Sequence, residues 1–465
     1  MDDWLELAWR PFAFRLPRQL VTAQGALVEK RGWLLRLQAA DGRLGWGEAA
    51  PLEPQALGAG AIQPPGSQGQ GSRVQGHQGQ DSQRQGPLSQ DAAVQAPFGL
   101  RPTAVPADGQ PGDRRGAPDS QAPATGLPTT ERQLPAPGSP TAPLTSPDGF
   151  EACAAAITDL GPRLERRVLE QALPQLPRPL AFALGLALAE LDGLGSPAQR
   201  GWLAAPPSAE LLPAGAAALT ALDALLQRRP PGQATSPAPA EAAAQMAWDA
   251  LRNGQPPGQA ASLSAAADIQ GSAAEPLRQP IAPITVKWKV AAGPDAEERA
   301  VLEQLLARLP AGWTLRLDAN GGWDRATAQA WAERLAGDPR LDWLEQPLSV
   351  ADPEGLERLA ALVPVALDES LMADPALAQR WSGWQVIRPA SAGDPRPLLA
   401  ALQAGTPNLC LSTALETGIG RRLLAHLAAL QAQGPTPTAP GLAPGWRPRG
   451  DLFAGDPERV WQAVG

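Results

Sequence analysis

Between Ile284 and Gln433 the chain alternates short apolar stretches with amphipathic ones, and this alternation restricts the fold more than any other feature. The apolar stretches predict strands at 284–290, 314–318, 341–345, 363–368, 384–388 and 408–412, each followed by a helix. An earlier short strand is expected within 208–215. Strands that alternate with helices form parallel sheets with right-handed crossovers. Seven or eight such units predict a (β/α) barrel rather than a doubly wound sheet.

Two stretches have a composition that predicts insertions without a fold of their own. Residues 53–147 are rich in Gln, Gly, Pro and Ser and contain none of the 15 Trp. Such a sequence buries too little apolar surface to offset the entropy lost on ordering, so we expect disorder there. A second interruption, rich in Pro, Gly and Ala, runs from about 228 to 279.

The predicted strand at 284–290 contains Lys287 and Lys289, two of only three lysines among the 39 Lys and Arg residues. Residues two apart on a strand face the same side. A lysine can lose its proton when it is desolvated or lies beside another cation, whereas an arginine stays protonated. The pair therefore indicates a site that needs a base. The alternative is a solvated, charged edge strand.

Every predicted strand from this one onward ends in a polar residue. These residues are Lys289, Asp318, Glu345, Asp368, Arg388 and Ser412, at intervals of 20 to 29 residues. The C-terminal ends of barrel strands meet at one mouth, where active sites lie. Three carboxylates at that mouth suit Mg²⁺, although a single one would more often cap the next helix. A lysine beside such a metal indicates abstraction of a proton next to a carboxylate.

Composition argues against several other classes of protein. The net charge of -8 without a basic patch argues against a nucleic-acid partner. Two His residues are too few for a His-rich zinc site, and the sequence gives no support for a His-based triad. No apolar run approaches the roughly 20 residues that cross a bilayer, and the acidic start lacks a signal-peptide core. We expect a cytoplasmic protein without membrane insertion, of unknown oligomeric state.

Short motifs lie at the predicted strand ends. They are Lys287-Trp-Lys289, Leu317-Asp-Ala-Asn320, Trp343-Leu-Glu-Gln-Pro347, Ala366-Leu-Asp-Glu-Ser370 and Ser412-Thr-Ala-Leu-Glu-Thr-Gly-Ile-Gly420. Together with further matches at 45–52 and 211–215, these motifs resemble those of the enolase superfamily. The resemblance implies an α/β architecture with a catalytic (β/α) barrel at 206–434. It also implies an α+β capping domain built from both chain ends, at 1–52, 148–205 and 435–465, with the two low-complexity stretches as insertions.

Within the superfamily the motifs are most similar to those of the dehydratases that form o-succinylbenzoate in menaquinone and phylloquinone biosynthesis. This resemblance implies a hydro-lyase acting on a small-molecule carboxylate, a succinyl-hydroxycyclohexadiene-carboxylate. By position, Lys289 would be the base, with Lys287 and Arg388 as further catalytic residues. Asp318, Glu345 and Asp368 would bind Mg²⁺, with Mn²⁺ as a substitute. Ser412, Thr413 and Asn320 would bind the substrate.

One position departs from the superfamily pattern, which has Lys before Pro on the sixth strand where this chain has Arg388. Arginine keeps the charge but cannot act as a base. Racemisation needs a base on each face of the enolate, whereas syn dehydration needs only one, so Arg388 favours a dehydratase. The alternatives are a cycloisomerase or N-acylamino-acid racemase of the same superfamily, or a catalytically silent barrel that acts as a binding protein.

The composition of residues 53–147 generates a first prediction. Replacing this tract with a short Gly/Ser linker should leave the melting temperature nearly unchanged, because the entropy of loop closure depends only weakly on loop length. Differential scanning calorimetry of both proteins measures this. A large fall in melting temperature would mean that the tract packs on the folded core.

Overall fold

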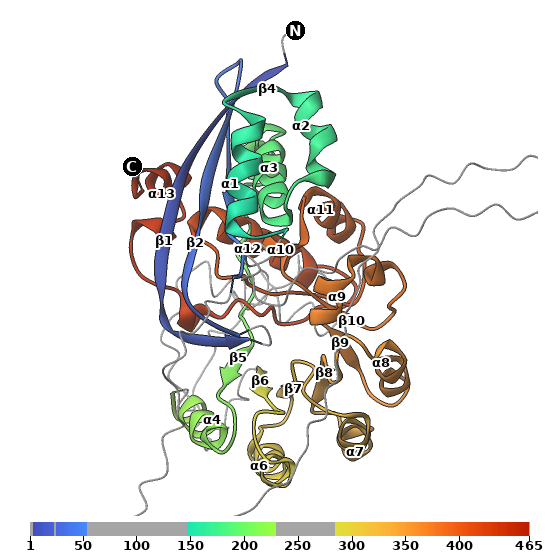
Figure 1. Ribbon diagram of the computed structural model, residues 1–465. Helices are drawn as coiled ribbons and strands as arrows, with labels where there is room; N and C mark the ends of the chain where they lie inside the picture. Colours follow the sequence, from blue (N-terminus) through green and yellow to red (C-terminus); the bar gives the residue numbers. More distant parts are fainter. Residues whose placement is uncertain (1–2, 23–24, 54–146, 229–283, 465) are drawn as a thin grey trace, which may run out of the picture. The chain divides into compact units, whose positions relative to one another are not determined.

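The computed structural model describes residues 3–22, 25–53, 147–228 and 284–464 (Figure 1). The two predicted insertions lie almost entirely outside these ranges. The two ends of the first gap are held together, since the Glu53 carboxylate accepts a hydrogen bond from the backbone N–H of Phe150 at 2.7 Å. The domain boundaries remain a prediction.

The first of two sheets is antiparallel, with strand order β3-β2-β1-β4. Its strands are β1 (Trp4–Thr22), β2 (Gly25–Ala39), β3 (Leu44–Ala49) and β4 (Arg163–Glu165). The turn between β2 and β3 contains Gly42 with φ of 84°, a left-handed conformation that glycine adopts without strain. The strands β2 and β3 pair as an antiparallel hairpin across this turn. We call this sheet the capping sheet.

Helix α3 (Arg178–Leu191) packs closely on the capping sheet and is buried along nearly its whole length. Glycines in β3 make the approach possible. A Cβ atom at Gly45 or Gly47 would lie about 2 Å from the carbonyl oxygen of Ala187 or Ala183. The remaining elements on this side are α1 (Phe150–Leu160), α2 (Arg166–Ala172), and the short 3₁₀ helices η1 (Leu173–Gln175) and η2 (Pro197–Gln199).

The second sheet is parallel, in the order β11-β10-β9-β8-β7-β6-β5, and its strands follow one another in an arc (Figure 1). The strands are β5 (Glu210–Leu212), β6 (Thr285–Lys289), β7 (Thr314–Asp318), β8 (Leu341–Glu345), β9 (Val365–Leu367), β10 (Trp384–Ile387) and β11 (Leu409–Leu411). All of these strands except β5 coincide with strands predicted above to within about two residues, and β5 lies inside the predicted 208–215 stretch.

Helices follow these strands as the alternation predicted. They are α4 (Ala217–Arg228), α6 (Asp295–Arg308), α7 (Arg325–Leu335), α8 (Pro353–Ala360), α9 (Glu369–Ala373), η4 (Pro375–Gln379), α10 (Pro389–Ala392), α11 (Arg396–Gln403) and α12 (Gly418–Ala432). After α12 come η5 (Pro444–Trp446), η6 (Asp451–Phe453) and α13 (Pro457–Gln462). The parallel strands with their helices and the separate antiparallel sheet confirm the predicted fold class.

The chain between α12 and η5 connects the two edges of the parallel sheet. The Gly441 N–H donates to the carbonyl of Leu411 at 2.8 Å on the β11 side. On the β5 side, the Ala209 N–H donates to the carbonyl of Pro440 at 2.9 Å. The backbone hydrogen bonds therefore continue from β11 to the start of β5. Further along, the carbonyl of Trp461 in α13 accepts from Arg10 of β1 at 2.9 Å, so the segment 435–465 contacts both sheets.

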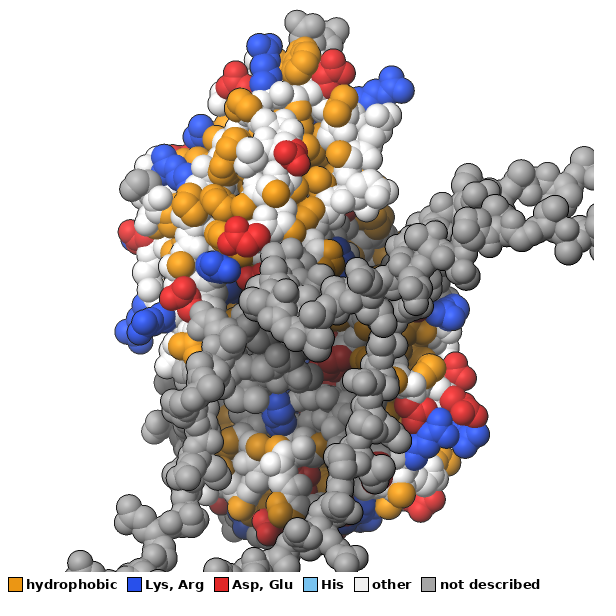
Figure 2. All heavy atoms as spheres, in the orientation of Figure 1, with side chains coloured by type: hydrophobic (Ala, Val, Ile, Leu, Met, Phe, Trp, Pro, Cys, Tyr) orange, Lys and Arg blue, Asp and Glu red, His pale blue; other side chains and the backbone are white. Residues whose placement is uncertain are grey.

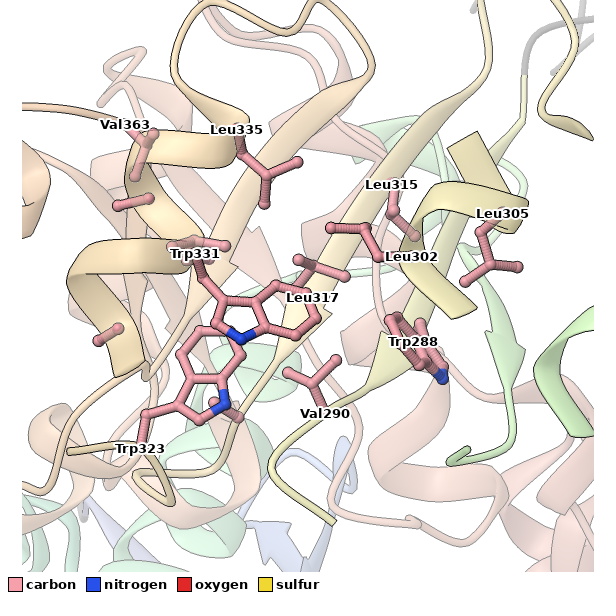
Figure 3. Packing of buried hydrophobic residues seen from close by; sticks show 14 of the residues in the cluster. Trp288, Val290, Leu302, Leu305, Leu315, Leu317, Trp323, Trp331, Leu335 and Val363 are labelled. Atoms are coloured by element: carbon pink, nitrogen blue, oxygen red, sulfur yellow. The ribbon is translucent and has the colours of Figure 1, made fainter. Parts of the chain in front are cut away.

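Strand alternation sends the tryptophan of Lys287-Trp-Lys289 to the opposite side from the two lysines. Trp288 is fully buried between the strands and the outer helices, where it packs among leucines and tryptophans (Figure 3). Its ring lies 6.3 Å from that of Trp331 in α7, and Trp331 stacks on Trp323 at 4.9 Å. Because Trp288 occupies the outer core, Lys287 and Lys289 are directed to the inside of the barrel.

The outward faces of the barrel helices are charged. Arg325 of α7 pairs with Asp352 and Glu354, and Arg358 pairs with Glu354 on α8. Acidic and basic side chains lie side by side over these helices in Figure 2. The pair of Arg358 and Glu354 is 66% and 62% exposed, so it adds little stability.

Candidate active site

The register of the parallel strands places the first predicted site residues in one row. Lys289 of β6 lies opposite Asp318 of β7, and Asp318 lies opposite Glu345 of β8. Each of the three is the last residue of its strand. In the sequence, neighbouring members of this row are separated by one helix and one strand. In the fold they lie side by side at the C-terminal mouth of the barrel.

The Lys287 side chain forms ion pairs with two of these carboxylates. Its Nζ lies 2.8 Å from Oδ2 of Asp318 and 2.6 Å from Oε1 of Glu345. Burial lowers the pKa of Lys287, but the two carboxylates outweigh burial and raise it. Burial raises the pKa of Glu345, and Lys287 acts against that shift. Lys287 is therefore a fixed ammonium group that neutralises the row, which makes it unsuited to act as a base.

Asp368 lies one step beyond the end of β9 and is fully buried. Arg388, which follows β10, binds both of its carboxylate oxygens through Nη1 and Nη2. Burial lowers the pKa of Arg388, but Asp368 and Glu369 raise it by a larger amount. Arg388 therefore forms a bidentate ion pair with Asp368, whose buried carboxylate would otherwise lack a positively charged partner.

Residues Asn320 and Glu369 form a third part of the mouth. The Asn320 side-chain amide donates to Oε1 of Glu369 at 3.0 Å, and Asn320 has a left-handed φ of 47°. Glu369 was not among the predicted site residues, because a strand that continued through it would turn its side chain to the opposite side from Asp368. In the structure β9 ends at Leu367 and α9 begins at Glu369, so that alternation no longer applies. The sequence feature that could have identified Glu369 is the Asp-Glu pair at the junction between a strand and a helix.

The donor atoms at this mouth fit a divalent cation in type. They include the carboxylates of Asp318, Glu345 and Asp368. Two buried oxygens, Oδ1 of Asn320 and Oε2 of Glu369, also lie here without a hydrogen-bond partner among the described residues. All are hard oxygen ligands of the kind Mg²⁺ prefers. Within the described ranges, however, no three acidic, His or Cys side chains converge on one point. Lys287 and Arg388 hold the carboxylates, and metal binding would require them to release these oxygens.

The predicted substrate-binding residues Ser412 and Thr413 lie at the end of β11, in a loop that leads to α12. The Thr413 hydroxyl donates to Glu416 at 2.6 Å, and the Ser412 hydroxyl lies 3.5 Å from the carbonyl of Gly441. Both hydroxyls are therefore engaged within the loop and its immediate neighbour. We call residues 412–417 the β11 loop.

A layer below the carboxylate row was not anticipated from the sequence. Arg316, two residues before Asp318, is fully buried and lies 3.8 Å from the ring centroid of Trp343. It also pairs with Asp342 at 2.8 Å. The indole N–H of Trp343 in turn donates to Glu345 at 3.4 Å. The inner face of the barrel thus supports the carboxylate row with a cation and an aromatic ring.

Comparison with known proteins shows which proteins this chain is similar to. Residues 283–381 match the family described as enolase C-terminal domain-like. The o-succinylbenzoate synthase of Thermosynechococcus vestitus is 44% identical over 154 residues, which are 31% of this chain and 48% of that protein. The enzyme of the same name from Mycolicibacterium smegmatis is 37% identical over 121 residues, 24% of this chain and 37% of that protein. The chain thus spans about half the length, or less, of these relatives.

One solved structure resembles this chain over nearly the whole length of both proteins. It is o-succinylbenzoate synthase from Thermosynechococcus elongatus complexed with Mg in its active site, with a TM-score of 0.58 and 24% identity, covering 99% of this chain and 100% of that one. This likeness concerns the fold. The chain therefore shares its fold with this synthase, and residues 283–381 match the enolase C-terminal domain-like family. The sequence similarity to part of the o-succinylbenzoate synthases confirms the resemblance stated from the motifs.

In the part of the chain that the structure describes, no helix is long and apolar enough to cross a membrane.

The buried pair of Arg388 and Asp368 generates a second prediction. Arg388→Leu should lower the free energy of unfolding by about 3–5 kcal/mol, because it leaves a buried carboxylate without its partner. Arg358→Leu is the matched control, since Arg358 pairs with Glu354 on the exposed face of α8. Urea titration in the presence of a chelator measures both. Equal, small losses in the two variants would contradict the role given to Arg388.

Proposed function

We propose that this chain is a Mg²⁺-dependent dehydratase that forms o-succinylbenzoate from its succinyl-hydroxycyclohexadiene-carboxylate precursor, in quinone biosynthesis. The observation that carries the proposal is the row of Lys289, Asp318 and Glu345 at matched ends of adjacent strands. The similarity to o-succinylbenzoate synthases over part of their length supports the choice of reaction. Cys153 and Cys410 are both free thiols, which agrees with a reducing compartment such as the cytoplasm.

Asp318, Glu345 and Asp368 would hold Mg²⁺, with Mn²⁺ as a substitute. When bound, the metal offsets negative charge on the substrate carboxylate. Lys289 in its neutral form takes the proton from the carbon next to that carboxylate. The resulting ammonium group then returns this proton to the hydroxyl group on the same face. The carbon–oxygen bond breaks, water leaves, and the ring becomes aromatic.

The other basic residues have different roles. Lys287, which pairs with Asp318 and Glu345, would release them when the metal binds and would stay protonated, contributing positive charge at the mouth. Arg388, on the far side of the row, places a guanidinium group that can offset charge on a planar anion without giving up a proton. Because the residue at this position is an arginine, which cannot give up its proton, Lys289 serves as a single base. This arrangement supports syn dehydration over racemisation. Ser412, Thr413 and Asn320 would bind the substrate, a small carboxylate.

Metal dependence is the third prediction. Chelation should abolish dehydration, and Mg²⁺ or Mn²⁺ should restore it. Asp368→Asn should weaken Mg²⁺ binding by at least about tenfold, a change of about 1.4 kcal/mol, measured by isothermal titration calorimetry. Asp352→Asn is the control, because Asp352 caps α8 and pairs with Arg325 instead of with a residue of the carboxylate row. Full activity in excess chelator would mean that the reaction does not depend on a metal.

The fourth prediction concerns the base. Lys289→Arg keeps the positive charge but provides no usable neutral form. Dehydration should fall by about 10²–10⁴-fold while substrate still binds, because a positioned acid–base group contributes a factor of this size. Steady-state kinetics and exchange of the substrate proton with deuterated water measure the loss. Activity within a few-fold of the unaltered protein would exclude Lys289 as the base.

Racemisation of N-acylamino acids is the discriminating assay for the alternative function. The unaltered protein should show none, since a second base is needed on the other face of the enolate. Efficient racemisation would overturn the dehydratase proposal, whereas the absence of both reactions would favour a barrel that binds without catalysis.

A further inference from the structure

The third lysine of the chain, Lys30, is buried in the capping sheet and contacts the β11 loop. Its side chain is only 1% exposed. The Nζ atom donates to the carbonyl of Ala414 and, at 3.2 Å, to the carbonyl of Leu415. A side chain on β2 therefore binds the backbone of a loop more than 380 positions later in the chain.

The segment that Lys30 binds has a strained backbone. Leu415 has φ of 64°, in the left-handed region that costs a residue with a side chain about 1–3 kcal/mol. The bonds from Lys30 fall on this residue and on the one before it. Glu416, which is also buried, accepts from the backbone N–H of Ala414 at 2.7 Å and from the Thr413 hydroxyl at 2.6 Å. The surroundings thus determine the conformation of Leu415.

A second residue of the capping sheet holds the far end of the loop. Glu48 of β3 is fully buried, and both of its oxygens accept from the backbone N–H of Thr417 at 2.9 Å. Oε2 also accepts from the N–H of Gly420, in the first turn of α12. A Cβ atom at Gly420 would lie 3.0 Å from this oxygen, so glycine leaves room for the carboxylate.

We propose that Lys30 and Glu48 are positioning residues that hold the β11 loop in the conformation in which Ser412 and Thr413 recognise the substrate. The capping sheet thereby sets substrate affinity from outside the barrel. This inference rests on the substrate-binding role proposed for the loop. Lys30 and Glu48 act on binding through the loop backbone, and Lys289, the proposed base, lies on a different strand, β6.

Another contact between the same two parts of the molecule provides a control. Glu190 of α3 forms a buried ion pair with Arg422 of α12 at 2.5 Å. This pair connects the capping side to the same helix that Glu48 reaches, and its hydrogen bonds join Glu190 to Arg422 and to the backbone N–H of Trp46. Arg422→Met removes a buried connection without removing the bonds that hold Ala414 and Leu415.

The first measurement is hydrogen–deuterium exchange in the protein without ligand. In Lys30→Met the amides of residues 413–417 should exchange about 10–100-fold faster, because each lost buried hydrogen bond costs about 1–3 kcal/mol. Arg422→Met should leave exchange in this loop unchanged. Glu48→Gln, which keeps the side-chain shape, should give a smaller increase and serves if Lys30→Met does not fold.

The second measurement separates positioning from general stability. For the succinyl-hydroxycyclohexadiene-carboxylate, KM should rise about 10–100-fold in Lys30→Met, with kcat within a few-fold of the unaltered protein. Lys30→Arg should recover part of the affinity. Arg422→Met should lower the melting temperature and leave KM unchanged.

The outcomes distinguish this inference from the proposed function. If loop exchange is unchanged in Lys30→Met and Glu48→Gln, the positioning role is wrong whatever the activity. If exchange rises but KM does not, the two residues hold the loop without affecting recognition, and the inference also fails. If the unaltered protein has no dehydratase activity, the proposed function fails, and the exchange data still decide whether Lys30 holds the loop.

Discussion

The mouth of the barrel depends on the compensation of buried negative charge. Asp318, Glu345 and Asp368 are buried carboxylates at adjacent strand ends, where an isolated charge would be too costly to retain. Lys287 supplies one compensating cation and Arg388 the other. A metal would take the same oxygens, so Lys287 and Arg388 would have to release them for it to bind. Charge compensation therefore links the stability of the mouth to its proposed chemistry.

The two sheets depend on each other through buried polar contacts. Lys30 and Glu48 of the capping sheet bind the backbone of the β11 loop and the start of α12. Both side chains are buried, so each needs its partners across this contact. Close packing of α3 on the glycines of β3 keeps this part of the sheet in place. The capping sheet thus contributes to the geometry of the barrel mouth as well as covering apolar surface.

Several elements were predictable because their signals are local. Strands at 314–318 and 341–345, each followed by a helix, were predicted from the alternation of apolar and amphipathic stretches, and the structure has them at these positions. The direction of side chains at the ends of short strands was less predictable. Glu369 faces the mouth because β9 stops two residues before it, and strand length depends on pairing with neighbours. The role of Lys30 was also not visible, since nothing in its local sequence points to a loop so distant in the chain.

The sequence by itself determined the order of strands and helices, the polar residue at each strand end and the restriction of lysine to three positions. These properties depend on residue type and spacing, which a chain carries before it folds. Only the tertiary structure decided which cation meets which carboxylate: Lys287 binds Asp318 and Glu345, and Arg388 binds Asp368. It also decided that Lys30 reaches Leu415. Such pairings depend on strand register and on the packing of one sheet against another, and neither is encoded in any single stretch of residues.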